Sequence, residues 1–485
     1  MTTAVAKPKE KKLTKTQLKR IEEQEMQYEF AKMWLRNDYS CITTISELKR
    51  VLKKFGDEFA MDTETSGLDI RPGKTELFGI SLSNNEAEAY WIPNPTDKMK
   101  QMLQTKMKTS RVILAKADYD IPILENNGIE VVDFVDIFIP VHLLYPNERL
   151  GGLKGTADKL LTGIGETLLL NKLLGKSKTE IEYGDFNKLE DWVQLAYAAQ
   201  DADITWRLWE LDKIKEIETK YPVIWKLEHD LVRPLIHMKL SGIKIDIDLI
   251  KEQDIVLEQA RTKIVEKVNK IASKKSGEKI ELNLNSSQQK ADFLFGSFIK
   301  PKEKGAKGRH RKSDALIGLD GKPLVPLERT ESGRGSTMKK FMNSIKSKHP
   351  AVELILQASS LASLRSNFTN KIPNIMDDDG KLRTSFWALG AATGRFTSSG
   401  PNLQNAPKSQ ADYIPVNIRN CFIADKDYVL LDIDYAQIEL RLAASFSGEP
   451  VWIKAFESGE SPHVATAIEM FGKKYTEDEY KKSKN

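Results

Sequence analysis

The segment EFAMDTETSGLDI at residues 58–70 most constrains the fold, because it starts as an apolar strand and runs into acid. Asp62 and Glu64 are separated by a single threonine. Successive side chains of a strand point to opposite faces, so the two carboxylates share a face at the end of a predicted core strand. Like charges held this close repel each other. The pair is therefore either a solvated strand end or part of a cation-binding site.

Further acids in the sequence favour cation binding. KADYD places Asp120 after a second apolar strand, and YAAQDAD places Tyr197 and Asp201 on one face of a predicted helix. If these acids converge with the first pair, divalent cations would relieve the repulsion. Oxygen ligands in a chain with only 6 histidines favour Mg²⁺ or Mn²⁺ over zinc. Two such ions about 3.5–4 Å apart can cleave a phosphodiester with an activated water, which Tyr197 could orient.

Composition sets wider limits. A chain of 485 residues with 40% hydrophobic and 29% charged residues is expected to form several globular domains. It has no apolar run of membrane-spanning length and no secretory signal, so we expect a cytoplasmic protein without a membrane partner. Cys41 and Cys421, the only cysteines, suit a reducing compartment. The net charge of +5 permits a nucleic-acid partner without requiring one.

The spacing of apolar residues and the density of charge change along the chain. Residues 14–36 have helical spacing, and strands alternate with helices from 42 to about 215, which predicts an α/β domain. Long helices follow, interrupted at 300–335 by a segment that opens with 7 Lys or Arg in 15 residues. We expect a mobile basic loop there, with residues 300–312 binding the phosphate backbone or simply solvated. A second α/β region begins at DYVLLDIDYAQIELRLAASF.

The first acid cluster resembles a known family. DTET, KADYD and YAAQD, in this order, are similar to the three motifs of the DEDD-type 3′→5′ exonucleases, in the subclass with tyrosine. The resemblance implies that Asp62, Glu64 and Asp201 bind metal. It implies that Asp120 supports them and that Tyr197 positions the water.

Two other positions belong to this resemblance. The family's middle motif usually carries an asparagine four residues before its aspartate, where this chain has Lys116. That departure implies that single-stranded DNA is bound differently at this position, where the lysine could contact a phosphate. Asp136 in VDIF matches a further family position and is expected to be structural.

A second acid cluster lies in YVLLDIDYAQIELR, which is also predicted to run from a strand into acid. Asp432 and Asp434 would share a strand face. The helix that follows is expected to bury Ile438, Leu442 and Phe446.

This second motif resembles motif A of the family A DNA polymerases, the group of bacterial DNA polymerase I. The resemblance implies that Asp434 binds both catalytic metals with help from the Tyr435 carbonyl. It implies that Gln437 and Glu439 contact the nucleotide, Glu439 excluding ribonucleotides by its bulk.

Other segments resemble parts of the same family in the same order. They are TGRFTSSGPNLQNAP, LASLRSNFTNKI and the thumb turn NLNSSQQ. Each alone would be an ordinary polar loop or helix cap. Together they imply DNA contacts by Lys116, Arg365, Asn367, Arg395, Asn402, Gln404 and Asn405.

The resemblance also implies missing parts. No fingers helix with NFG and no HDE motif occurs before Asn485, although Lys481, Lys482 and Lys484 could open such a helix. We therefore expect a separate C-terminal polypeptide that completes the polymerase. A split gene of this kind is expected in a phage genome, which would place the protein in the host cytoplasm.

The implied fold class is a multidomain α/β protein. It comprises a basic extension and helix at 1–40, a ribonuclease H-like exonuclease domain at 41–218, a helical thumb at 219–378 with the basic insertion, and the start of an α+β palm at 379–485.

The leading interpretation is the N-terminal portion of a replicative family A DNA polymerase with proofreading activity. Its cofactors would be Mg²⁺ or Mn²⁺ in two-metal sites. Its partners would be single-stranded DNA, primer–template and, in the completed enzyme, dNTP. The alternatives are a free-standing 3′→5′ exonuclease and a non-catalytic DNA-binding or assembly subunit. The intact acids argue against the last.

Overall fold

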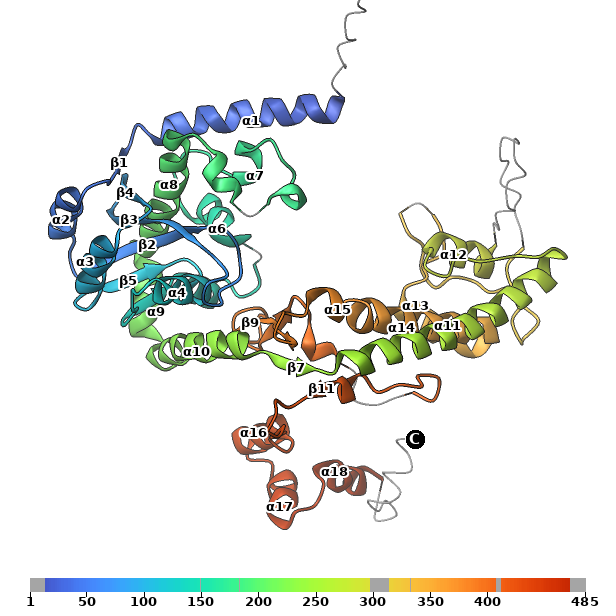
Figure 1. Ribbon diagram of the computed structural model, residues 1–485. Helices are drawn as coiled ribbons and strands as arrows, with labels where there is room; N and C mark the ends of the chain where they lie inside the picture. The colour runs from blue at the N-terminus through green and yellow to red at the C-terminus, as the bar shows by residue number, and fades with distance from the viewer. Residues whose placement is uncertain are drawn as a thin grey trace, which may run out of the picture. The chain divides into compact units, whose positions relative to one another are not determined.

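The computed structural model describes residues 14–471, apart from positions 149, 183, 297–313, 332 and 407–410. The chain divides into two compact units, Met1–Ile423 and Ala424–Asn485 (Figure 1). The expected basic loop at 300–312 and the lysines at 481, 482 and 484 lie outside the described residues. In the described part of the chain, no helix combines the length and apolar character needed to cross a bilayer.

The first unit begins with a mixed sheet of six strands. The strands are β1 (Asp38–Cys41), β2 (Glu58–Thr65), β3 (Leu77–Asn85), β4 (Glu88–Pro93), β5 (Arg111–Leu114) and β6 (Phe134–Asp136), in the order β1-β4-β3-β2-β5-β6. The strand β2 runs antiparallel to β3 and parallel to β5. The acidic strand predicted from the sequence therefore lies inside the sheet.

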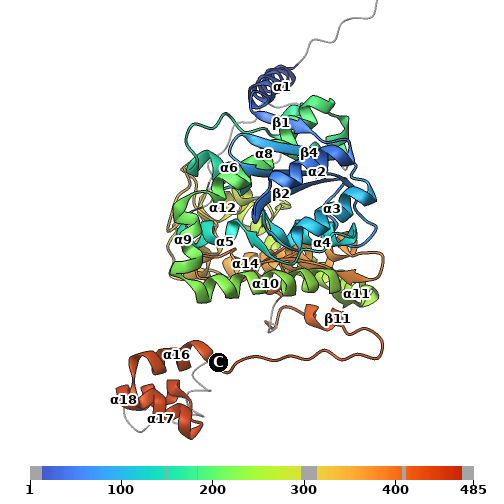
Figure 2. The same cartoon turned by 90° about the vertical axis from the view of Figure 1, so that its left-hand side faces the viewer.

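Helices cover both faces of this sheet. They are α2 (Ile45–Lys54), α3 (Asp97–Met107), α4 (Ala117–Asn126), α5 (Phe138–Leu144), α6 (Gly152–Leu160), α7 (Leu170–Leu173), α8 (Asp191–Trp209) and α9 (Asp212–Lys220). Figure 2 shows α3 on one side of β2 and α6 on the other. The helix α8 ends at Trp209, and Asp212 lies in the first turn of α9, where an acid is favoured.

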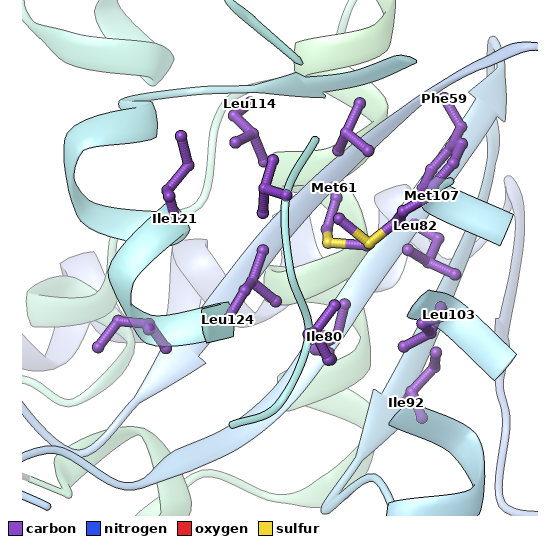
Figure 3. Close-up of a cluster of buried hydrophobic side chains, with 14 of the residues drawn as sticks. Phe59, Met61, Ile80, Leu82, Ile92, Leu103, Met107, Leu114, Ile121 and Leu124 are labelled. Atoms are coloured by element: carbon purple, nitrogen blue, oxygen red, sulfur yellow. The ribbon is translucent and has the colours of Figure 1, made fainter. Parts of the chain in front are cut away.

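The alternation of β2 divides its side chains between two apolar cores. Phe59 and Met61 pack with Leu103 and Met107 of α3 in one core (Figure 3). Ala60 packs in the other core, which includes residues of α8. Residues of even number on β2 therefore face α8.

The N-terminal helix α1 (Lys15–Trp34) packs against the segment 164–174. The side chain of Gln27 accepts a hydrogen bond from the Leu169 N–H at 2.6 Å. The indole of Trp34 donates to the Glu166 carbonyl at 2.9 Å. Between these points, the Leu168 N–H donates to the Gln200 side chain of α8 at 2.9 Å. The helix thus supports a loop that is itself bonded to α8.

Long helices follow, as expected. They are α10 (Pro222–Ser241), α11 (Ile247–Ser276), α12 (Ser287–Phe295), α13 (Lys339–Ser344), α14 (Pro350–Leu364) and α15 (Ile372–Ile375). Gly242, with φ 60°, ends α10. Leu257, Ile264 and Val268 of α11 share a core with α14, and Figure 1 shows these two helices running alongside each other.

Short strands complete the first unit. The strand β7 (Ile243–Ile245) pairs with β8 (Lys381–Leu382) and β11 (Phe422–Ile423). The strand β9 (Ser385–Trp387) pairs with β10 (Thr397–Ser399) in an antiparallel hairpin.

The second unit differs from the sequence expectation. Its described elements are the helices α16 (Ile438–Ser447), α17 (Pro450–Ser458) and α18 (Pro462–Phe471). The strand expected at 428–434 is absent, because no described segment pairs with these residues and a lone strand leaves its backbone groups unpaired.

The apolar face expected for α16 is also exposed rather than buried. Ile438 and Leu442 are 41% and 48% exposed, and Phe446 is 87% exposed. Val429 before the helix is equally open, at 87%. The helix itself forms where predicted, but no described element of the second unit covers these side chains.

Candidate metal centre

Three carboxylates meet at the junction of β2 and α8. Asp62 and Glu64 lie on the side of β2 that faces α8, and Asp201 extends from α8 toward them. One oxygen from each lies within 4.8 Å of the others, and this is the group of potential metal ligands found among the described residues. The like-charged pair predicted from the sequence is thus one side of a three-acid cluster.

A glycine makes room beside this cluster. Gly79 of β3 lies directly opposite Glu64 in the register of the two strands. A Cβ at Gly79 would lie 2.2 Å from the indole of Trp91. The absence of a side chain therefore lets the Trp91 ring pack next to the acidic edge of β2.

The electrostatics of the cluster favour a bound cation. Burial, reinforced by the charges of Asp120, Asp201 and Glu64, raises the pKa of Asp62 well above its usual value. Burial, followed by the charge of Asp201, does the same to the pKa of Glu64. Burial also raises the pKa of Asp201. A divalent cation would reverse these shifts by stabilising the ionised carboxylates.

Asp120 is near the cluster but lies on the other side of β2. It belongs to α4, is buried and accepts a hydrogen bond from the Thr63 hydroxyl. Thr63 alternates with the two acids of β2 and so points to the opposite face. Burial, with the charges of Asp136 and Asp118, raises the pKa of Asp120 to about 8.

Asp136 has the structural position expected for it. Its carboxylate accepts hydrogen bonds from the N–H groups of Lys116, Ala117 and Phe138 at 3.3, 2.9 and 3.0 Å. The first two of these groups lie at the N-terminus of α4, so Asp136 caps that helix. Burial, then the charge of Asp118, raises its pKa to about 6.

Tyr197 lies one turn before Asp201 on α8, as its spacing predicted. Its ring packs against Phe186 with 5.9 Å between centroids. Burial raises the pKa of its hydroxyl well above the usual value, so the phenol stays protonated and able to donate.

Sequence reasoning missed one charged residue at this site. The ammonium of Lys154, near the start of α6, lies 3.2 Å from Oδ1 of Asp201. It also lies 3.6 Å from the centre of the Tyr197 ring. No motif spacing marks Lys154, because its contact depends on how α6 packs against α8.

Lys116 lies at the edge of a cavity of about 260 Å³. It precedes α4 in a left-handed conformation, with φ 84°. Its ammonium lies 4.5 Å from the centre of the Trp387 ring, and both residues line the cavity. Thr156 and Glu228 also line it, and each has a buried oxygen without a hydrogen-bond partner in the described structure. The cavity therefore offers aromatic, cationic and acceptor groups together.

The residues expected to contact DNA lie in several different environments. Asn367 and Asn405 come together in the lining of a cavity of about 430 Å³, with several serines and two lysines. Arg365 is instead engaged within the protein. Its guanidinium donates twice to Asp254 at 2.9 Å and once to Glu258 of α11.

The remaining expected contacts lie on one exposed segment. Asn402 accepts from the Gln404 N–H at 3.0 Å, and the Gln404 side chain donates to the Phe396 carbonyl at 2.9 Å. These bonds shape the segment itself. Arg395 is exposed in the turn that precedes β10.

The expected polymerase residues of the second unit are all exposed. They are Asp434, Tyr435, Gln437 and Glu439. Gln437, with φ 53°, forms the N-terminal boundary of α16. Within the described residues, Asp434 joins no group of acids able to bind a metal.

These features define a protein that joins an α/β domain with an acidic centre to a long helical region. Comparisons with known proteins agree with this division. Residues 39–215 match the 3′-5′ exonuclease family, and residues 249–485 match DNA polymerase family A. The chain belongs to DNA polymerase family A and carries a 3′-5′ exonuclease domain.

Several curated relatives are bacterial DNA polymerases I. The enzyme of Borreliella burgdorferi is 29% identical over 89% of this chain and 44% of its own length. That of Chloroflexus aurantiacus is 28% identical over 85% of this chain and 42% of its own length. The chain thus spans less than half the length of these relatives.

A solved structure shares the fold. It is the POL domain of Pol1 from M. smegmatis, in complex with DNA primer-template and dNTP. It matches 92% of this chain and 70% of its own chain with a TM-score of 0.65 at 19% sequence identity.

Proposed function

We propose that residues 41–218 form a ribonuclease H-like 3′→5′ exonuclease that removes nucleotides from single-stranded DNA. The observation that carries this proposal is the convergence of Asp62, Glu64 and Asp201 within 4.8 Å, with Tyr197 one turn away from Asp201. The match of residues 39–215 to the exonuclease family supports it.

The residues present fit Mg²⁺ or Mn²⁺. All three donors are carboxylate oxygens, and one oxygen from each lies within 4.8 Å of the others. Hard oxygen donors of this kind suit these ions. When bound, a pair of such ions supplies activation of water and stabilisation of the leaving oxygen.

The surrounding residues have distinct proposed roles. Tyr197 donates a hydrogen bond that orients the attacking water. Asp120 supports the cluster from behind β2 through Thr63. Lys116 and Trp387 hold the single strand beside the cluster, the lysine through a phosphate and the indole by stacking on a base.

The rest of the chain is proposed to bind primer–template. In this assignment residues 219–378 are the thumb and residues 379–485 the first part of the palm. Asn367 and Asn405 line one cavity with Lys290 and Lys339, a combination suited to the DNA backbone. The match to DNA polymerase family A supports the assignment.

Polymerisation is proposed to require a C-terminal polypeptide that supplies the fingers and the remaining palm. The exposed apolar run from Tyr428 to Ile433, with Phe446 of α16, supports this proposal because such surfaces are normally covered. In the completed enzyme Asp434 and the Tyr435 carbonyl would hold Mg²⁺. Gln437 and Glu439 would contact the dNTP.

A nuclease assay tests the exonuclease assignment. Wild-type protein with Mn²⁺ should shorten a 5′-labelled single strand from its 3′ end. Asp62→Ala with Glu64→Ala should reduce this shortening to background. Glu76→Ala with Asp97→Ala removes the same charge at exposed positions and should leave it intact. Equal cleavage by wild type and the first double variant would disprove the assignment.

A primer-extension assay tests the polymerase assignment. Extension should appear when the chain is combined with a polypeptide that carries NFG and HDE, and Asp434→Ala should abolish it. A free-standing exonuclease remains the second candidate, because all three clustered acids lie within the first compact unit. It would be favoured if no combination extends a primer while the isolated chain degrades single strands.

A further inference from the structure

The acidic centre contains a cation of its own. We infer that Lys154 is the counter-cation of the centre: it holds Asp201 and Tyr197 in place without divalent ions and weakens the binding of those ions. This inference rests on the proposed function of the centre. It makes Lys154 a positioning residue that acts through Asp201 and Tyr197.

Three contacts fix the Lys154 ammonium. It pairs with Oδ1 of Asp201 at 3.2 Å, donates to the Leu168 carbonyl at 2.6 Å and lies 3.6 Å from the centre of the Tyr197 ring. These partners come from α8 and from the loop that α1 supports. The side chain is only 14% exposed, so water offers little competition for the ammonium.

The backbone places this lysine at the centre. Gly151 and Gly152 have φ 82° and 77°, a conformation that other residues adopt with strain. They turn the chain sharply into α6 just before Lys154. The lysine therefore starts from the first turn of a helix that packs directly against α8.

The charge balance explains why a cation is needed there. Asp62, Glu64 and Asp201 are close together and shielded from water, so their mutual repulsion is strong. Lys154 opposes the effect of burial on the pKa of all three acids. A single ammonium cancels part of the repulsion, but it also repels any divalent ion at the same carboxylates.

The inference predicts that replacing Lys154 changes stability and ion binding in opposite directions. A neutral side chain at position 154 should make the ion-free protein less stable, because the acids lose their counter-charge. It should also make ions bind more tightly, because the ammonium no longer repels them. A lysine that merely anchors the Leu168 loop would change stability without strengthening ion binding.

The experiment compares Lys154→Met with Lys98→Met, which removes the same charge at an exposed position of α3. Thermal unfolding in EDTA and Mn²⁺ binding by electron paramagnetic resonance are measured on the full chain. Lys154→Met should melt several degrees lower in EDTA and bind Mn²⁺ at least about fivefold more tightly. Lys98→Met should match wild type in both measurements.

The outcomes separate this inference from the proposed function. Wild-type protein that binds no Mn²⁺ would overturn both. Wild-type binding with equal or weaker affinity in Lys154→Met would overturn the inference and leave the metal centre standing.

A measurement on wild-type protein covers the case in which Lys154→Met does not fold. The extent of acetylation of Lys154 is followed by mass spectrometry in EDTA and in Mn²⁺. Its reactivity should rise several-fold with Mn²⁺, because the ions weaken its pairing with Asp201. Unchanged reactivity would overturn the inference.

Discussion

The ammonium of Lys116 lies 4.5 Å from the centre of the Trp387 indole, which joins the start of α4 to the β9–β10 hairpin. A cation over an aromatic face is an attractive contact, and both residues line the same cavity. An indole held in this way presents a surface on which an unpaired base can stack.

Trp387→Ala should therefore weaken the binding of single-stranded DNA. The expected loss is roughly tenfold, because stacking of one base is worth about 1–3 kcal/mol. Fluorescence anisotropy with labelled oligothymidine measures it, in the Asp62→Ala and Glu64→Ala background that prevents cleavage. Trp387→Phe retains a ring and should lose much less. If Trp387→Ala binds as tightly as its parent, the indole is not part of the DNA site.

The raised pKa of Asp120 predicts how stability depends on pH. Its folded value of about 8 lies above its unfolded value, so the folded state binds more protons between about pH 4 and 8. Stability from this group is therefore present at low pH and lost as pH rises toward 8. Asp120→Asn should stabilise the ion-free protein at pH 8 by more than about 1 kcal/mol.

Urea denaturation in EDTA at several pH values measures this effect. The advantage of Asp120→Asn should shrink toward pH 4, where the wild-type carboxyl is protonated in both states. Asp133→Asn, at an exposed position, provides the control. An advantage that is constant with pH would show that Asp120 does not titrate in this way.

Arg365 is predicted to stabilise the fold rather than to bind DNA directly. Arg365→Met would leave Asp254 without its bidentate partner, and the loss of a half-buried pair of this kind should cost about 1–3 kcal/mol. Asn367→Ala, two residues away in the serine-rich cavity, should instead weaken primer–template binding with little change in stability. Unfolding and filter-binding measurements on both variants check this contrast. A large loss of DNA affinity in Arg365→Met at unchanged stability would contradict it.

Local periodicity was enough to predict much of this structure. The two-residue spacing of Asp62 and Glu64 identified one face of β2, and the four-residue spacing of Tyr197 and Asp201 identified one face of α8. Each of these two predictions depends only on the geometry of a single strand or helix. The family motifs then supplied the order of the domains, which agrees with the two family matches.

The failures concern contacts between elements distant in sequence. The residues around Asp434 were expected to form a strand, but a strand exists only with a neighbour, and none is described there. Lys154 carried no signal, because its role depends on the packing of α6 against α8.

The contacts between α1 and the segment 164–174 affect where the exonuclease domain can be truncated. The family match begins at residue 39, which suggests a domain without α1. Yet the Gln27 side chain of α1 forms hydrogen bonds with the Thr167 carbonyl and the Leu169 N–H, on either side of Leu168. The Leu168 carbonyl in turn accepts a hydrogen bond from the Lys154 ammonium.

A truncated protein that begins at residue 39 should therefore retain the sheet but melt at a lower temperature and lose much of its nuclease rate. A start at residue 14 should preserve both properties, and differential scanning calorimetry with the same nuclease assay compares the two. Equal behaviour would place the functional boundary after α1. Otherwise the smallest active fragment must include α1, and it is therefore larger than the family-matched domain that contains the three acids.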